Sequence, residues 1–137
     1  MDECIFCKII RGEIPSQKLY EDDLAFVMLD AFPGTRGHTL IIPKAHHADV
    51  FDTPPELYAH LMKVATKMAE SLKQALNYDG VNIFQNTGRA SGQTVFHLHI
   101  HVFPRWLGDG ALGGWNPGNL SDSQFVGLGE LIRSHIS

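Results

Sequence analysis

The chain has 137 residues, 44% of them hydrophobic, and a formal charge of -4 at pH 7. A chain of this length buries enough surface for one core, so we expect a single domain over residues 1–137. The acidic balance and the lack of a Lys/Arg run argue against a nucleic acid polymer as partner, because proteins that bind such polymers carry a basic face. The segment MDECIFCKII lacks the apolar region of a signal peptide, and no apolar run has the length of a membrane helix. We therefore expect a cytoplasmic protein with no membrane partner.

Apolar runs bounded by turn residues predict strands at 24–29, 39–42, 81–84 and 96–103. Residues 53–56 (TPPE) predict the start of a helix, with Thr53 as its N-cap. Apolar side chains then recur at helical spacing up to Asn77, and a second capping box at 121–124 opens a C-terminal helix. Glycine-bearing loops are expected at 86–94 and 106–118. This order predicts an α+β fold with a mainly antiparallel sheet, one long helix and a C-terminal helix.

Three histidines, His97, His99 and His101, alternate with aliphatic residues along the last predicted strand. Side chains alternate between the two faces of a strand, so the three imidazoles share one face and the aliphatic residues pack on the core. A purely structural role would require a buried partner for both ring nitrogens of each histidine. The cluster therefore indicates a functional site.

Two kinds of chemistry use such a cluster. A neutral imidazole is a nucleophile toward phosphorus without help from a metal, and three imidazoles are also the ligands of a catalytic zinc with one open position. The spacing of the histidines does not choose between them. The segment before the strand, NTGRASGQT at 86–94, offers glycine amides and neutral donors suited to phosphate. No carboxylate lies between Asp79 and Asp109 to serve a catalytic zinc, which favours the nucleophile.

The segment HLHIHVF at 97–103 matches the histidine triad motif, and CIFCKI at 4–9 and GHTLIIPK at 37–44 extend the match over most of the chain. The sequence thus resembles the histidine triad (HIT) family of nucleotide hydrolases, in its small, zinc-containing bacterial-type branch. The resemblance implies a HIT-like α+β fold with a five-stranded, mainly antiparallel sheet. It also implies cleavage of a P–N or P–O–P bond at the α-phosphate of a purine nucleotide, as in a nucleoside phosphoramidase or a dinucleoside polyphosphate hydrolase. A homodimer joined through the long helix and a sheet strand is expected on the same ground.

The resemblance assigns roles to single residues. His99 is the nucleophile that carries the nucleotidyl group, His101 contacts phosphate oxygens, and His38 completes the catalytic set. Contacts to the substrate are implied for the ribose, the phosphate and the leaving group, from Asp30, Asn86, Gly92, Gln93 and Thr94. The apolar side chains of Phe6, Ile9 and Phe26 are candidates to enclose the purine, although core packing explains them equally well.

The pair Cys4 and Cys7 has the spacing of zinc ligands. The resemblance adds His46 and His97 as the other two ligands, which makes a closed structural zinc site and leaves the reaction without a catalytic metal. From the residues alone, His47 is an alternative to His46.

Two other functions remain open at this stage. One is a zinc-centred hydrolase that uses His97, His99 and His101 together, and the other is a nucleotide-binding sensor without turnover. The sequence after the triad, Phe103-Pro104-Arg105-Trp106, departs from the glycine pair of the phosphoramidases and is closer to the members that cleave polyphosphates. Arg105 is therefore either a contact to additional phosphates or a surface arginine. Trp106 and Trp115 are candidates to reach the site of a neighbouring subunit.

Overall fold

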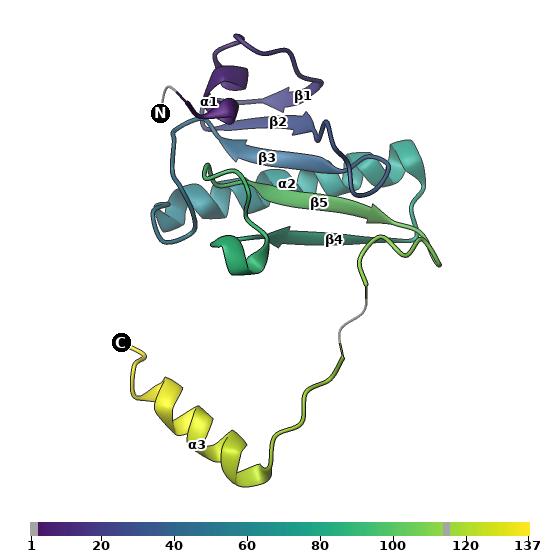
Figure 1. Cartoon of the computed structure of the whole chain (residues 1–137). Coiled ribbons are helices and arrows are strands. Elements are labelled where there is room, and N and C mark those ends of the chain that lie inside the picture. Colours follow the sequence, from purple (N-terminus) through teal and green to yellow (C-terminus); the bar gives the residue numbers. More distant parts are fainter. Residues whose placement is uncertain (1–2, 114–115) are drawn as a thin grey trace.

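The computed structural model describes residues 3–113 and 116–137. Its centre is a five-stranded antiparallel sheet in the order β1-β2-β3-β5-β4 (Figure 1). The strands are β1 (Lys18–Glu21), β2 (Ala25–Leu29), β3 (Thr39–Pro43), β4 (Gly80–Gln85) and β5 (Ile100–Arg105). The helices are α1 (Ile5–Ile10), α2 (Pro55–Leu76) and α3 (Asp122–Arg133), with a 3₁₀ helix η1 (Arg89–Ser91) before β5. The predicted α+β fold and its five-stranded antiparallel sheet are confirmed.

The long helix α2 packs on one face of the sheet. Its buried apolar stripe, which includes Leu61, Val64 and Leu72, meets Ile41 and Val102 of the central strands in the larger of two cores. Asn77 ends the helix in the left-handed conformation, with φ of 51°. The predicted amphipathic helix and its end near Asn77 are therefore confirmed.

The short helix α1 covers part of the opposite face, over β2 and β3. Phe6 and Ile9 of α1 pack with Phe26, Met28 and Leu40 in a second, smaller core. Because Leu40 pairs with His101 in the β3–β5 register, the face under α1 is also the face that carries the histidine.

Two local predictions were wrong. Strand β5 begins at Ile100 instead of residue 96; His97 lies in a bend at 95–97, and His99 lies between this bend and the strand. Pro54, not Thr53, caps α2, because the Thr53 hydroxyl donates to the Asp49 carbonyl (2.7 Å) and so closes the preceding turn.

Elements α1 and β1 were not predicted. Helix α1 is only 6 residues long, and β1 has a mostly exposed pattern with little alternation of polarity.

The C-terminal helix lies away from the sheet at the end of a long connection (Figure 1). Its predicted capping box is confirmed, since the Ser121 hydroxyl accepts from the Gln124 amide and the Gln124 side chain accepts from the Ser121 amide. None of its residues is buried, and Leu128 and Ile132 are among its exposed apolar side chains. In the part of the chain that the structure describes, no helix has the length and apolar character needed to cross a membrane.

Candidate active site and metal cluster

The alternation of the histidine segment is preserved although the strand begins late. Leu98, Ile100 and Val102 are fully buried in the larger core, as predicted, and the three histidines face the other way. The Leu98 amide donates to the carbonyl of His47 (2.7 Å), which anchors the segment before the sheet hydrogen bonds begin. His97 and His99 consequently point as they would on a regular strand.

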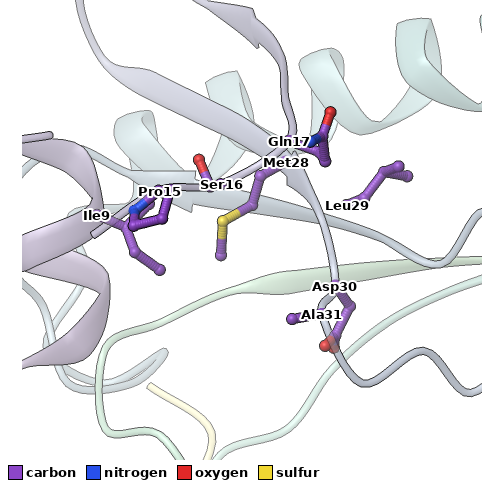
Figure 2. Close-up of a pocket in the computed structure, with 8 residues that line it drawn as sticks. All are labelled: Ile9, Pro15, Ser16, Gln17, Met28, Leu29, Asp30 and Ala31. Atoms are coloured by element: carbon purple, nitrogen blue, oxygen red, sulfur yellow. The ribbon is translucent and has the colours of Figure 1, made fainter.

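His99 and His101 face a cavity of about 310 Å³. Its wall combines apolar side chains of α1, β2 and β3 with polar groups of the loop after β2 and of the segment between β4 and β5. The lining residues include Ile5, Phe6, Ile9, Met28, Asp30, Gly92 and Thr94. An adjoining pocket continues past Asp30, and Figure 2 shows the Met28 side chain extending toward Ile9 and Pro15 within it. Since the two pockets share Ile9, Met28 and Asp30, they form one hollow that is polar near the histidines and mostly apolar beyond them.

The hydrogen bonds of His99 fix which ring nitrogen is free. Nδ1 lies 2.8 Å from the backbone carbonyl of His97, and a carbonyl only accepts, so Nδ1 carries the proton. Burial lowers the pKa of His99, with an opposing contribution from that hydrogen bond, and the ring is neutral at pH 7. The Nε2 lone pair of this cavity-lining ring is therefore available, and the edge-on ring of Phe6 at 5.0 Å supports its orientation.

A second series of hydrogen bonds determines which ring nitrogen of His101 is protonated. The Gly34 amide donates to His38 Nδ1 (3.1 Å), so His38 carries its proton on Nε2 and donates it to His101 Nδ1 (2.8 Å). His101 is left with an N–H at Nε2, which makes it a donor. Burial, followed by the neighbouring His99, lowers the pKa of His101 to about 3. Burial also lowers the pKa of His38, although Asp30 opposes this shift.

The loop before the histidine segment is folded tightly on itself. Gly88 and Gly92 adopt positive φ values of 88° and 104°, which favour glycine, on either side of η1. Gly92 and Thr94 line the cavity. A Cβ at Gly92 would lie 3.3 Å from Nδ2 of Asn86, which places the Asn86 amide directly behind this wall.

Gln93 differs from the expectation of a direct substrate contact. Its side chain is buried and does not line the cavity. Its amide nitrogen donates to the carbonyls of Ala48 and Val95, and its amide oxygen accepts from the Gly88 amide (2.8 Å). Gln93 therefore holds the loop that presents its neighbours Gly92 and Thr94.

Cys4, Cys7, His46 and His97 come together beside the cavity, with one ligand atom of each lying within 4.8 Å of all the others. The Nε2 of His97 lies 2.8 Å from the carbonyl of Pro43, so its lone pair is on Nδ1, toward the two sulfurs at 3.3 and 3.5 Å. Burial, and then a hydrogen bond and charge at Cys4, raise the pKa of the Cys7 thiol, and a bound cation would favour its thiolate form. This donor set fits a tetrahedral zinc ion with no open position.

His47 does not join this cluster. Its Nδ1 lies 3.7 Å from the Asp52 carboxylate instead, which leaves His46 as the histidine beside Cys7. His97 likewise faces the cysteines and is absent from the cavity lining.

Four further residues had alternative roles in the sequence analysis. Phe26 is buried in the smaller core and does not line the cavity, unlike Phe6 and Ile9. The Arg105 guanidinium bonds to Asp109 and Asn82, as a surface arginine does. Trp106 packs against the larger core of its own chain, and Trp115 lies outside the described residues.

Sequence and structure comparisons agree on a single family. Residues 11–106 match the model of the HIT domain. The chain is 44% identical over 104 residues (76% of this chain) to adenylylsulfatase HINT3 of Arabidopsis thaliana, of whose length the match spans only 53%. It is 37% identical over 134 residues, 97% of this chain and 98% of the relative, to adenosine 5'-monophosphoramidase hnt1 of Schizosaccharomyces pombe. A zinc-bound histidine triad family protein from Mycobacterium smegmatis has a TM-score of 0.78 and 40% identity, covering 98% of this chain and 99% of that one.

Proposed function

Since the chain belongs to the HIT family, we propose that it hydrolyses adenosine nucleotides at the α-phosphate, with His99 as the nucleophile. The observation that carries the proposal is the Nε2 lone pair of a neutral His99, in the wall of a cavity that also holds Asp30 and His101. Two relatives are named for reactions at an adenosine 5'-phosphoryl group, with an amine or sulfate as leaving group. The substrate class that fits is therefore a 5'-phosphoramidate, a mixed anhydride or a dinucleoside polyphosphate.

The proposed reaction has two steps. His99 Nε2 attacks the α-phosphorus, the P–Nε2 bond forms, and the bond to the amine, sulfate or phosphate leaving group breaks with its electron pair; an amine takes up a proton from solvent as it leaves. Water then attacks the same phosphorus and loses a proton to solvent, and the P–Nε2 bond breaks with its electron pair returning to Nε2, which releases the nucleotide and restores the imidazole. The Nε2–H of His101, with the Thr94 hydroxyl and the loop amide at Gly92, would stabilise charge on the phosphoryl oxygens in both steps.

The nucleoside would occupy the remainder of the hollow. Asp30 accepts from the Phe32 amide through Oδ1 (2.8 Å), and its second oxygen would accept from the ribose hydroxyls. The purine would then pack between the apolar side chains of Phe6, Ile9 and Met28. In this arrangement Asn86 and Gln93 support the loop at 86–94 from the side away from the cavity.

The orientation of His97 is the reason to prefer this function over a zinc-centred hydrolase. A metal bound by all three triad histidines would need His97 to face the cavity, whereas its Nδ1 lies against Cys4 and Cys7. We propose instead a structural zinc at Cys4, Cys7, His46 and His97. When bound, this ion would join the N-terminal helix to the histidine segment.

Turnover of three substrates in the presence of EDTA tests the proposed function. We expect the wild type to release AMP from adenosine 5'-phosphoramidate, adenylyl sulfate or diadenosine polyphosphate. Protein quenched in alkaline denaturant should carry a labelled adenylyl group that is stable to base and released by acid, as a phosphoramidate is. The fastest substrate identifies the leaving group. Binding of AMP without turnover of any substrate would indicate a sensor. Activity that is lost in EDTA and regained with zinc, in a protein that stays folded, would support the zinc-centred alternative.

We also propose that the chain is a homodimer joined at β4 and α2. Among the described residues, strand β4 pairs only with β5, and Val81 is partly exposed on this edge. Light scattering is expected to give twice the 15.2 kDa of the chain. A charge at this edge, in V81K, should shift the protein toward monomer, whereas L19K on the opposite edge strand should not. A monomeric wild type, or equal dissociation of both variants, would contradict the proposal.

A further inference from the structure

An aromatic ring lies flat against one histidine of the site. Phe84 of β4 is the direct cross-strand partner of His101 in β5. Partners in an antiparallel pair project from the same face, and here the two rings stack with centroids 4.6 Å apart and an angle of 12° between their planes. None of the other ring pairs in the described residues is as close to parallel as this pair, whose interplanar angle is set by the strand register.

A second aromatic ring, that of Phe103, packs against the edge of this stack. Phe103, two residues after His101 on the same strand face, contacts Phe84 at 5.0 Å and His38 at 4.1 Å, in both cases edge to face. Phe103 is buried and packs against the loop at Gly34, where a Cβ would come within 2.6 Å of the ring. The ring thus fits only because residue 34 is a glycine, and the amide of that glycine is the donor to His38.

His101 needs support beyond its one hydrogen bond. The bond from His38 reaches Nδ1, but a hydrogen bond tolerates a range of angles, so it restricts rotation of the imidazole about its Cβ–Cγ bond only loosely. Such a rotation would swing the Nε2–H away from the phosphoryl oxygens. A flat ring against its face removes this freedom, so the hydrogen bond and the stack together define one orientation.

We propose that Phe84, held in place by Phe103, is a positioning residue that fixes the plane of His101 for the phosphoryl-transfer site. The inference rests on the proposed function for its effect on turnover, and on the ring geometry alone for its effect on His101. Phe84 does not line the cavity and touches no reacting atom. Its effect is therefore on the transition state, through the direction of the His101 N–H, more than on binding of the nucleotide.

The test compares F84L, F84Y and F51L, with F51L as the matched control because Phe51 is 89% exposed. We expect F84L to lower kcat about tenfold while KM changes by less than about twofold, since a lost ring pair and a misdirected donor act in the transition state. The tyrosine variant retains the stacked ring, so it should recover most of the lost kcat. Thermal unfolding of each variant separates this effect from a loss of folded protein.

Imidazole ¹⁵N NMR of His101 gives a readout that a merely structural role would not move. In F84L the His101 signals should report mixed tautomers or exchange, while the signals of His99 stay sharp and those of F51L match the wild type. Equal kcat in folded F84L and F51L, with unchanged His101 signals, would overturn the proposal. If the wild type turns over no nucleotide, the proposed function fails, and the NMR comparison still decides the positioning role.

Discussion

Replacement of His99 by alanine is expected to lower kcat for an adenosine phosphoramidate by at least about a thousandfold, because the variant has no atom to form the nucleotidyl intermediate. The adenylyl label on protein quenched in alkaline denaturant should disappear with it. Binding of AMP should weaken much less, since Asp30 and the apolar wall of the cavity remain. The measurement is single-turnover release of AMP in EDTA.

The matched control is H135A, because His135 lies on the exposed C-terminal segment and forms its hydrogen bonds there. This variant should keep the kcat of the wild type. A folded H99A protein with near-normal turnover, or with an undiminished adenylyl label, would remove His99 from the nucleophilic role.

The double substitution C4S/C7S is expected to abolish stoichiometric zinc and to lower the unfolding temperature by about 10 °C, because a structural metal contributes its binding free energy to folding. Serine preserves the size of both side chains and removes the thiolates. The loss should be greatest around α1, since Cys4 caps that helix and Cys7 is buried in it. Metal analysis and calorimetry measure the two effects.

Wild-type protein treated with a strong chelator provides the comparison for the double variant. Both should melt at the same temperature, and added zinc should restore only the wild type. A wild type purified without zinc that neither binds the ion nor gains stability from it would contradict the proposed site. Retention of stoichiometric zinc by C4S/C7S would show that other residues hold the ion.

The parts of the fold that the sequence predicted are those with long periodic patterns. The stripe of α2 extends over 22 residues, so its length and buried face followed from spacing alone. Helix α1 and strand β1 are too short for such a signal, and their stability comes from contacts with β2 that depend on the tertiary fold. The start of β5 was misplaced because the alternation of polarity continues into a segment that is not paired in the sheet, where the Leu98 amide donates to the His47 carbonyl.

The sequence predicted which residue types form the candidate site, but not which contacts each of these residues makes. The HxHxH pattern placed the histidines on one face, but only the structure separates His97, among the cysteines, from His99 and His101, at the cavity. The stack of Phe84 on His101 depends on the register of two strands, which a single sequence does not specify. In the sequence, a glutamine that supports a loop cannot be told from a glutamine that contacts a ligand. The structure shows that the Gln93 side chain forms three hydrogen bonds to backbone groups, so it supports the loop.

The smaller core and the apolar wall of the cavity are built from the same side chains. Phe6, Ile9, Met28 and Leu40 pack together under α1, and all four also line the hollow. At the proposed base-binding wall, a substitution that accepts another base is therefore at the same time a change in the packing of the N-terminal helix on the sheet. A change of base selectivity there would carry a direct stability cost, which the larger core under α2 is free to offset because none of its buried residues lines the cavity.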